Sequence, residues 1–153
     1  MIKKVADKDV ARAIDLVNRV FAEFVAVDYA EQGRNTFEAY LQCKLEEVSA
    51  ALKSGDKEMW AYCREDKILG VIATQGASHI SLMFVDKQHH RQGIARKLFD
   101  VVRDELGKNK NITQITVNSS PYAVKVYEHL GFTKTGEQQE KDGIIFIPMM
   151  RPL

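Results

Sequence analysis

Residues 79–100 read His-Ile-Ser-Leu-Met-Phe-Val-Asp-Lys-Gln-His-His-Arg-Gln-Gly-Ile-Ala-Arg-Lys-Leu-Phe-Asp, and the rest of the chain is best understood from this segment. Its first half, Ile80 to Val85, is apolar and rich in strand-forming residues, which predicts a buried strand. From Ile94 onward the apolar residues recur at helical spacing, which predicts an amphipathic helix through Leu106. A short polar turn, residues 90–95, joins the strand to the helix.

This turn has the features of an anion-binding site. The first amides of a helix have no intrahelical partner, and the helix dipole adds partial positive charge there. Gly93 and Ala95 have little or no side chain to keep a ligand from the backbone, while Arg91 and Arg96 add formal positive charge. The turn therefore indicates a pyrophosphate site. Taken alone, it is also explained by an ordinary strand-to-helix turn with a surface arginine pair.

The order of strand, polar turn and helix resembles the acetyl-CoA-binding motif of the GNAT N-acetyltransferase superfamily. The family form, Gln/Arg-x-x-Gly-x-Gly/Ala, falls on His90, Gly93 and Ala95; the last two fit, and His90 departs from Gln or Arg. In the family the pyrophosphate is bound largely by backbone amides, so the departure weakens the motif more than it weakens the expected binding. The resemblance implies a pyrophosphate site made by Arg91, Gln92, Gly93, Ile94, Ala95 and Arg96.

A second segment resembles the family's next conserved block. Residues 124–132 read Val-Lys-Val-Tyr-Glu-His-Leu-Gly-Phe, and the family block ends in Tyr-Glu-x-Leu-Gly-Phe. The resemblance implies that Tyr127 lies beside the sulfur of bound CoA and acts as the general acid. A phenol suits this role, because a thiolate that leaves a thioester can be protonated by a nearby hydroxyl. Without the resemblance, Tyr127 would be read as a half-buried aromatic residue of a helix.

The resemblance also implies where the pantetheine arm binds. In the family the fourth and fifth strands splay apart, so main-chain groups of Met83, Phe84 and Val85 are expected to pair with the cofactor instead of a strand. The family's pantetheine-contacting asparagine corresponds to Ser120, and Asn118, two residues earlier, is a candidate substitute. For both residues a helix-cap or turn role is the alternative.

Length and composition predict a single soluble domain, residues 1–153. A chain of 153 residues can bury a substantial core, and 45% hydrophobic with 28% charged residues is typical of soluble globular proteins. The net charge of +1 gives no basic field that favours nucleic acid. No apolar run reaches membrane-spanning length, and the first residues lack the apolar core of a signal peptide. We therefore expect a cytoplasmic protein without nucleic-acid or membrane partners.

The two cysteines, Cys43 and Cys63, are too few for a disulfide framework and lack the spacing of zinc ligands. We expect reduced thiols, with a single disulfide as the alternative. His89 and His90 are adjacent and point apart, so they make a poor metal site, and no bound metal is expected.

The remaining periodicities predict a mixed α/β protein. Strands are expected at residues 2–5, 59–64, 68–74 and 112–117, with a closing hairpin of residues 132–135 and 144–149. Further helices are expected from Asp7 or Asp9 to Phe24, from Asn35 or Thr36 to Gly55, and from Tyr122 to Leu130, ended by Gly131. With the resemblance, the expected fold is GNAT-like: a mixed, mostly antiparallel sheet of about seven strands with helices on both faces.

The sequence gives fewer signals for the residues that would bind the acceptor amine than for those that would bind the cofactor. In the family the first helix, the next loop and the second helix form much of the acceptor wall, which makes Glu23, Asp28, Tyr29 and Glu31 candidates to meet a cationic amine. For each one, a solvated loop residue is the simpler interpretation. His79 has a suitable unperturbed pKa for a general base, but it also fits a surface histidine at a strand end, and we name no base.

The function expected from the resemblance is acetyl transfer from acetyl-CoA to a primary amine, by direct attack in a ternary complex. The acceptor stays open among a polyamine, an aminoglycoside, an amino acid and a protein amino group. Oligomeric state also stays open, although homodimers are common in the family. Two alternatives remain: a catalytically inactive acyl-CoA-binding or sensing module of the same fold, and an unrelated α/β domain with coincidental motifs.

Overall fold

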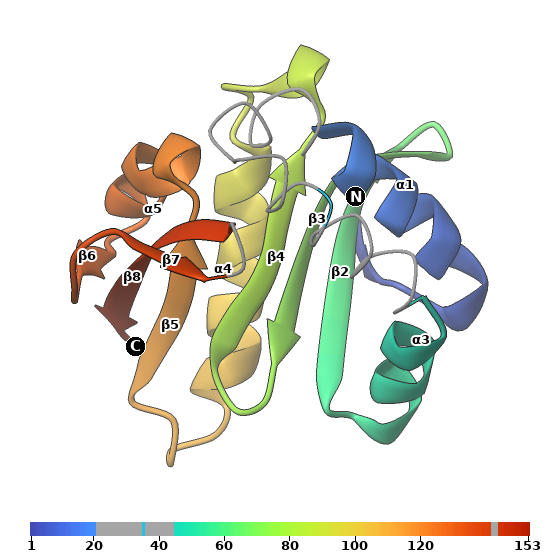
Figure 1. Ribbon diagram of the computed structural model, residues 1–153. Coiled ribbons are helices and arrows are strands. Elements are labelled where there is room, and N and C mark those ends of the chain that lie inside the picture. The colour runs from blue at the N-terminus through green and yellow to red at the C-terminus, as the bar shows by residue number, and fades with distance from the viewer. Residues whose placement is uncertain (21–34, 36–44, 142–143) are drawn as a thin grey trace.

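The computed structural model describes residues 1–20, 35, 45–141 and 144–153. Within them, a mixed sheet has the strand order β1-β2-β3-β4-β5-β8-β6, and β7 pairs with β8 outside this path (Figure 1). The strands are β1 (Ile2–Lys4), β2 (Lys57–Arg64), β3 (Lys67–Gln75), β4 (His79–Val85), β5 (Gln114–Ser119), β6 (Thr133–Lys134), β7 (Gln139–Lys141) and β8 (Ile144–Pro152). The helices are α1 (Val10–Val20), α3 (Leu45–Ser54), α4 (Ile94–Gly107) and α5 (Val124–His129), with 3-10 turns η1 (Asp7–Asp9), η4 (Lys87–His89) and η5 (Pro121–Ala123).

Each described strand pair is antiparallel except β4 with β5, which is parallel. The expected mixed, mostly antiparallel sheet is therefore confirmed. The sheet gains a strand, β7, that the sequence analysis missed. Its residues, Gln139–Lys141, are exposed throughout, so no alternation of apolar and polar side chains marks them as a strand.

The core lies on both faces of the sheet, because successive side chains of a strand point to opposite faces. Met59 and Ala61 of β2 belong to a buried cluster with α1. Trp60 and Tyr62, which alternate with them, belong to a second cluster with α4 and α5. The helices therefore cover both faces, as expected, with α1 on one and α4 and α5 on the other (Figure 1).

Some element boundaries differ from the sequence prediction. The β2–β3 connection is shorter than expected, since Arg64 pairs directly with Lys67 and only Glu65 and Asp66 form the turn, both with positive φ. β5 continues through Ser119 because β8 pairs along it as far as that residue. The region predicted as one helix from Tyr122 to Leu130 begins instead with the 3-10 turn η5.

Two helix ends agree with the sequence analysis. Gly55 follows α3 with φ of 85°, and Gly131 follows α5 with φ of 97°. Both have the left-handed conformation that suits the residue after a helix. The predicted helix residues Phe21 and Phe24, and the start of the second helix near Thr36, lie outside the described residues. In the described ranges, no helix is both long and apolar enough to cross a bilayer.

Candidate functional site

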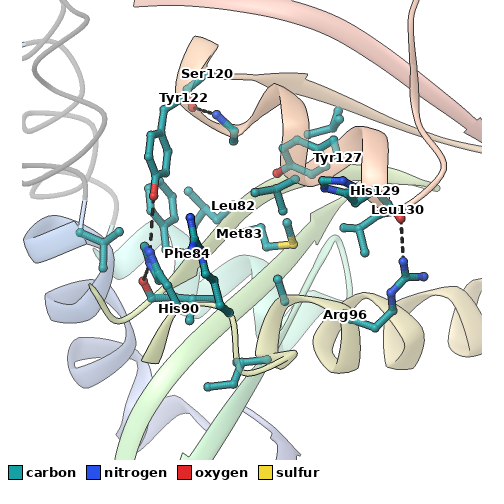
Figure 2. Close-up of a pocket in the computed structure, with 18 of the residues that line it drawn as sticks. Leu82, Met83, Phe84, His90, Arg96, Ser120, Tyr122, Tyr127, His129 and Leu130 are labelled. Atoms are coloured by element: carbon teal, nitrogen blue, oxygen red, sulfur yellow. Dashed lines mark hydrogen bonds between the residues drawn. The ribbon is translucent and has the colours of Figure 1, made fainter. Parts of the chain in front are cut away.

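A cavity of about 570 Å³ opens where β4 and β5 separate. The two strands pair through His79 with Thr116 and Ile80 with Val117. Beyond Ile80, β4 continues along β3 whereas β5 continues along β8. The space between them is lined by β4, the turn into α4, the first turn of α4, η5 and α5 (Figure 2). The splayed strands expected from the sequence are therefore present.

The N-terminus of α4 opens onto this cavity. Gly93 is its N-cap residue, with a left-handed φ of 78° and no side-chain cap. The Lys97 amide donates to the Gly93 carbonyl at 3.0 Å, so the amides of residues 94–96 have no intrahelical acceptor. The first turn carries no acidic residue, and a Cβ placed on Gly93 would meet no atom within 4 Å. The backbone is thus open to an approaching anion.

Arg91 adds both charge and backbone strain to the turn. Its φ of 63° lies in the left-handed region that residues other than glycine rarely adopt. Strain of this kind is typically found at functional sites. The Arg91 and Arg96 side chains line the cavity, and the described part of its wall includes no carboxylate. The side chains there consequently favour a negatively charged ligand.

Arg96 has a second contact, which the sequence analysis did not foresee. Its Nη2 atom donates to the carbonyl oxygen of His129 at 2.6 Å (Figure 2). His129 is the last residue of α5, where a cation stabilises the helix carbonyls. Arg96 therefore ties the first turn of α4 to the end of α5.

The edge of β4 also contributes main-chain groups. The Asp86 amide donates to the Leu69 carbonyl of β3 at 2.7 Å. Because the main-chain groups of successive strand residues point to alternate edges, those of Val85 and Met83 face away from β3, toward the cavity. Those of Phe84, which pairs with Val71, face β3 instead, so the expected main-chain contact of Phe84 with the cofactor is not available. The Val85 carbonyl accepts a hydrogen bond from His90 Nε2 at 2.8 Å. His90 therefore occupies a main-chain group that the sequence analysis assigned to the cofactor.

His90 also contacts the opposite wall of the cavity. Its Nδ1 atom lies 3.4 Å from the Tyr122 hydroxyl, which η5 carries (Figure 2). Since Nε2 must hold a hydrogen to reach a carbonyl, Nδ1 of the neutral ring accepts and the phenol donates. Burial raises the pKa of Tyr122 and nearby Arg91 partly offsets this, so the phenol is protonated at neutral pH. The pair joins the turn before α4 to η5.

Tyr127 is the buried phenol of the cavity. Only 4% of the residue is exposed, and burial raises its pKa well above the ordinary 10.0. Its ring meets Phe132 edge-on at 5.4 Å, and Phe132 meets Phe99 of α4 in the same way at 5.6 Å. Tyr127 therefore carries a protonated hydroxyl group, and its ring is held in position by the contacts with Phe132 and, through Phe132, with Phe99.

The two candidates for the pantetheine contact both line the cavity. The Ser120 hydroxyl accepts from the Ala123 amide at 3.2 Å and caps η5, so its helix-cap role is confirmed. The hydroxyl proton stays available to a ligand. Asn118 is exposed on β5. A ligand contact for either residue stays a prediction.

The structure brings together all but one of the residues predicted for the cofactor. Those that line the cavity are Met83, Phe84, Val85, Arg91, Gly93, Ile94, Ala95, Arg96, Asn118, Ser120 and Tyr127, whereas exposed Gln92 does not. The cavity is also lined by residues that were not predicted for the cofactor: Val20, Ser81, Leu82, His89, His90, Val117, Tyr122, Ala123, Val126, His129 and Leu130. Helical spacing from Ala123 to Leu130 could have identified some of them, but no local signal marks Ser81 or Tyr122.

The general-base candidate, the cysteines and the acceptor-side candidates are not among the described residues that line the cavity. The His79 ring, whose pKa burial lowers, bonds Thr116 Oγ1 at 2.8 Å and does not line the cavity. Cys63 is a free thiol outside the cavity, and Cys43 lies beyond the described residues. So do the acceptor-side candidates Glu23, Asp28, Tyr29 and Glu31. Within the described ranges, no three His, Cys, Asp or Glu side chains are grouped to hold a metal.

Comparison with known proteins gives the context of this cavity. No curated protein matches the sequence. A GCN5-related N-acetyltransferase from Rhodopseudomonas palustris superposes with a TM-score of 0.81 at 17% identity, covering 100% of this chain and 95% of that one. The PaiA N-acetyltransferase of Thermoplasma acidophilum, solved with coenzyme A, gives 0.78 at 16% identity, covering 100% and 98%. An aminoglycoside 6'-N-acetyltransferase, also with coenzyme A, gives 0.71 at 12% identity, covering 99% and 96%.

At these identities the structural similarity shows the fold. The family is shown by the sequence, because the model of the acetyltransferase (GNAT) domain matches residues 25–153. That range includes both motifs, the splayed strands and every residue that lines the cavity except Val20. The chain belongs to the GNAT acetyltransferase family.

Proposed function

We propose that this protein transfers an acetyl group from acetyl-CoA to a primary amine, by direct attack in a ternary complex. The proposal treats residues 1–153 as one N-acetyltransferase domain. One observation carries it: a single cavity has an uncapped helix N-terminus in one wall and the side chain of Tyr127 in another. Two structural relatives with this fold were solved with coenzyme A, which supports the choice of cosubstrate.

The cavity residues fit the chemistry of coenzyme A. The free amides of α4, with Arg91, suit a pyrophosphate. The exposed edge of β4 and the apolar side chains Leu82, Met83 and Val126 suit an arm that alternates amides with methylene groups. Arg96, bonded to His129, would act on the phosphates through its main-chain amide and its overall charge. In the free protein, His90 donates to the Val85 carbonyl, and the second lone pair of that oxygen stays available to a cofactor amide.

Bound acetyl-CoA supplies the acetyl group as a thioester. Tyr127 keeps its proton at neutral pH, so its hydroxyl can donate that proton to the sulfur as the bond between carbon and sulfur breaks. The nitrogen of the acceptor loses one proton to solvent water as its bond to carbon forms, and Tyr127 takes one up from solvent after the thiol leaves, so the step balances. Among described residues no cysteine lines the cavity, which favours direct transfer over an acyl-enzyme.

Calorimetric titration with acetyl-CoA, CoA and dephospho-CoA tests the cosubstrate. Gly93→Glu places an anionic side chain at the helix N-terminus, so binding should be lost in this variant and present in the wild type. Thiol release in the presence of a panel of amines then tests transfer, with Tyr127→Phe as the variant that keeps binding but loses turnover. Absence of acetyl-CoA binding to the wild type would refute the proposal.

The second candidate is an inactive acyl-CoA-binding module. The observation in its favour is that the described part of the cavity wall contains neither a carboxylate nor His79, which leaves the histidines His89, His90 and His129 as the candidate bases there. Binding of acetyl-CoA without thiol release for any amine would support this module. Turnover that depends on Tyr127 would exclude it.

A further inference from the structure

Ser81 lies in a β-bulge at the point where β4 leaves β5. Its neighbours Ile80 and Leu82 pair with consecutive residues of β3, so Ser81 is an extra residue in the β4 strand. The last described pair between β4 and β5 is Ile80 with Val117. The bulge therefore coincides with the vertex of the splayed strands, and Ser81 lines the cavity there. Bulges commonly redirect a side chain next to a functional site.

The hydroxyl of Ser81 is oriented by two hydrogen bonds. Lys57 Nζ donates to its oxygen at 3.4 Å, and the hydroxyl donates to the Ala73 carbonyl at 3.4 Å. Both distances lie at the long end of the hydrogen-bonding range, so both bonds are weak. A hydroxyl oxygen has two acceptor positions, which leaves one for a ligand that donates an N–H.

The orientation of Lys57 places this hydroxyl toward the α1 face of the sheet. Lys57 shares a strand face with Met59 and Ala61, which pack with α1. Tyr127 belongs to the core on the opposite face, with α4. Ser81 and Tyr127 therefore approach the vertex of the cavity from opposite sides of the sheet. An acetyl group held at the vertex can therefore meet the amine near Ser81 while its sulfur lies toward Tyr127.

Ser81 is also well separated from the phosphate end of the cavity. It lies four positions before Val85 in β4, which corresponds to about 13 Å at the rise of a β-strand. The turn with Arg91 and Gly93 lies at the Val85 end of β4, because His90 in that turn bonds the Val85 carbonyl. A role for Ser81 in binding phosphate is therefore excluded by distance.

We infer that Ser81 positions the acceptor amine, with its oxygen accepting one N–H of the attacking nitrogen. The inference rests on the proposed function and names a residue for the acceptor side of the same cavity. A neutral amine that donates one N–H to Ser81 keeps its lone pair for the carbonyl carbon. Ser81 is a positioning residue, because the transferred proton passes to neither its oxygen nor Lys57 in this arrangement.

The test compares the wild type with Ser81→Ala. Thiol release from acetyl-CoA is first measured with putrescine, kanamycin, phenylalanine and trialanine, which represent the four acceptor classes, and the best amine is kept. For Ser81→Ala, kcat/KM for that amine should fall about tenfold, the effect of one lost hydrogen bond. The Kd of CoA should change less than about twofold, since no phosphate contact is lost. Ser81→Thr keeps the hydroxyl and should recover most of the activity.

Ser78→Ala is the matched control. Ser78 precedes β4, its carbonyl accepts from the Thr116 amide at 3.1 Å, and its side chain does not line the cavity. This variant should keep wild-type kinetics. An unchanged kcat/KM for the amine in Ser81→Ala would overturn the inference. So would a loss of CoA affinity as large as the loss of activity, provided that the variant keeps wild-type thermal stability.

The experiment distinguishes failure of the proposed acetyl transfer from failure of the Ser81 inference. If the wild type releases no thiol with any amine, the same four amines are titrated into the CoA complex by calorimetry. Binding that Ser81→Ala weakens about tenfold would then support Ser81 as the amine contact in a protein without transferase activity. Absence of amine binding to the wild-type complex would overturn both the inference and the proposed function.

Discussion

The guanidinium of Arg96 donates to the carbonyl of His129 across 2.6 Å and so joins the first turn of α4 to the last residue of α5. Phe99, three residues further along α4, contacts Phe132, and Phe132 contacts Tyr127. The uncapped end of α4 and the buried phenol are thus connected by one hydrogen bond and one aromatic chain. Because α5 has six residues, these contacts rather than helix propensity hold Tyr127 in position.

Removing the Arg96 hydrogen bond should affect turnover more than cofactor affinity. In Arg96→Met we expect kcat to fall about tenfold, because α5 loses a charge-assisted bond and Tyr127 is held less firmly. Steady-state kinetics and calorimetry with CoA measure the two effects. Arg96→Lys, which can still donate to His129, should recover part of kcat. A loss of CoA affinity equal to the loss of kcat would show instead that the guanidinium contacts the phosphates.

Gly93 and Gly76 form a matched pair of sites. Their φ values are 78° and 64°, and a Cβ at either position would meet no atom within 4 Å. Alanine at each site should therefore lower the free energy of unfolding by about 1 kcal/mol through backbone strain alone. Only Gly93→Ala should also weaken CoA binding, because Gly76 lies outside the cavity. Urea unfolding and calorimetry measure the two quantities, and equal CoA affinity in both variants would contradict the phosphate site at α4.

The Asp86 carboxylate should make stability depend on pH in the acid range. Burial alone raises its pKa, but the Gln88 amide, His89 and Arg19 together lower it below the ordinary 3.8. The stabilisation is therefore present above the ordinary value and is lost as pH falls through the lower pKa of the folded protein. Asp86→Asn should reduce the free energy of unfolding at neutral pH, and the difference from wild type should shrink below about pH 4.

Urea unfolding of both proteins across this range measures the effect. The Arg19 bond to Asp86, at 2.6 Å, is partly exposed, so part of the effect should disappear at high salt. A difference in the free energy of unfolding between wild type and Asp86→Asn that stays constant from neutral to acid pH would contradict the lowered pKa of Asp86.

Tyr127 should not titrate in the range where the protein is assayed. Burial raises its pKa above the ordinary 10.0, so its hydroxyl stays protonated at neutral and moderately alkaline pH. Tyr127→Phe should lower kcat by about 10² to 10⁴-fold, the usual contribution of a general acid, and should leave the acid limb of the pH profile unchanged. The measurement is kcat of both proteins between about pH 6 and about pH 10. A wild-type alkaline limb that disappears in Tyr127→Phe would contradict the high pKa.

Local sequence patterns predicted most of the secondary structure. The change from an apolar strand at Ile80 to helical spacing from Ile94 is visible without any tertiary information, and β4 and α4 lie where it indicates. The exposed strand β7 has no such pattern, since it is formed by pairing with β8. The bulge at Ser81 is equally invisible, because it depends on the register that β3 imposes on β4.

For the site, the sequence identified residues that act through their own backbone or through a motif, such as Gly93 and Tyr127. It did not identify the contact of His90 with Tyr122, which are 32 residues apart, or that of Lys57 with Ser81, 24 residues apart. Nor did it show that the Arg96 side chain bonds α5. These contacts depend on how β4, β5 and the helices pack, and no local propensity encodes them.

The sequence by itself determined the elements around the cavity, the family resemblance and the glycine that leaves α4 uncapped, because periodicity and backbone freedom are local properties. The tertiary structure decided which side chains meet. Where β4 and β5 separate, it placed Ser81 in a bulge and Tyr127 in the core beside α4, and it committed His90 to the Val85 carbonyl. Such pairings arise from strand register and helix packing, which bring together residues from distant parts of the chain.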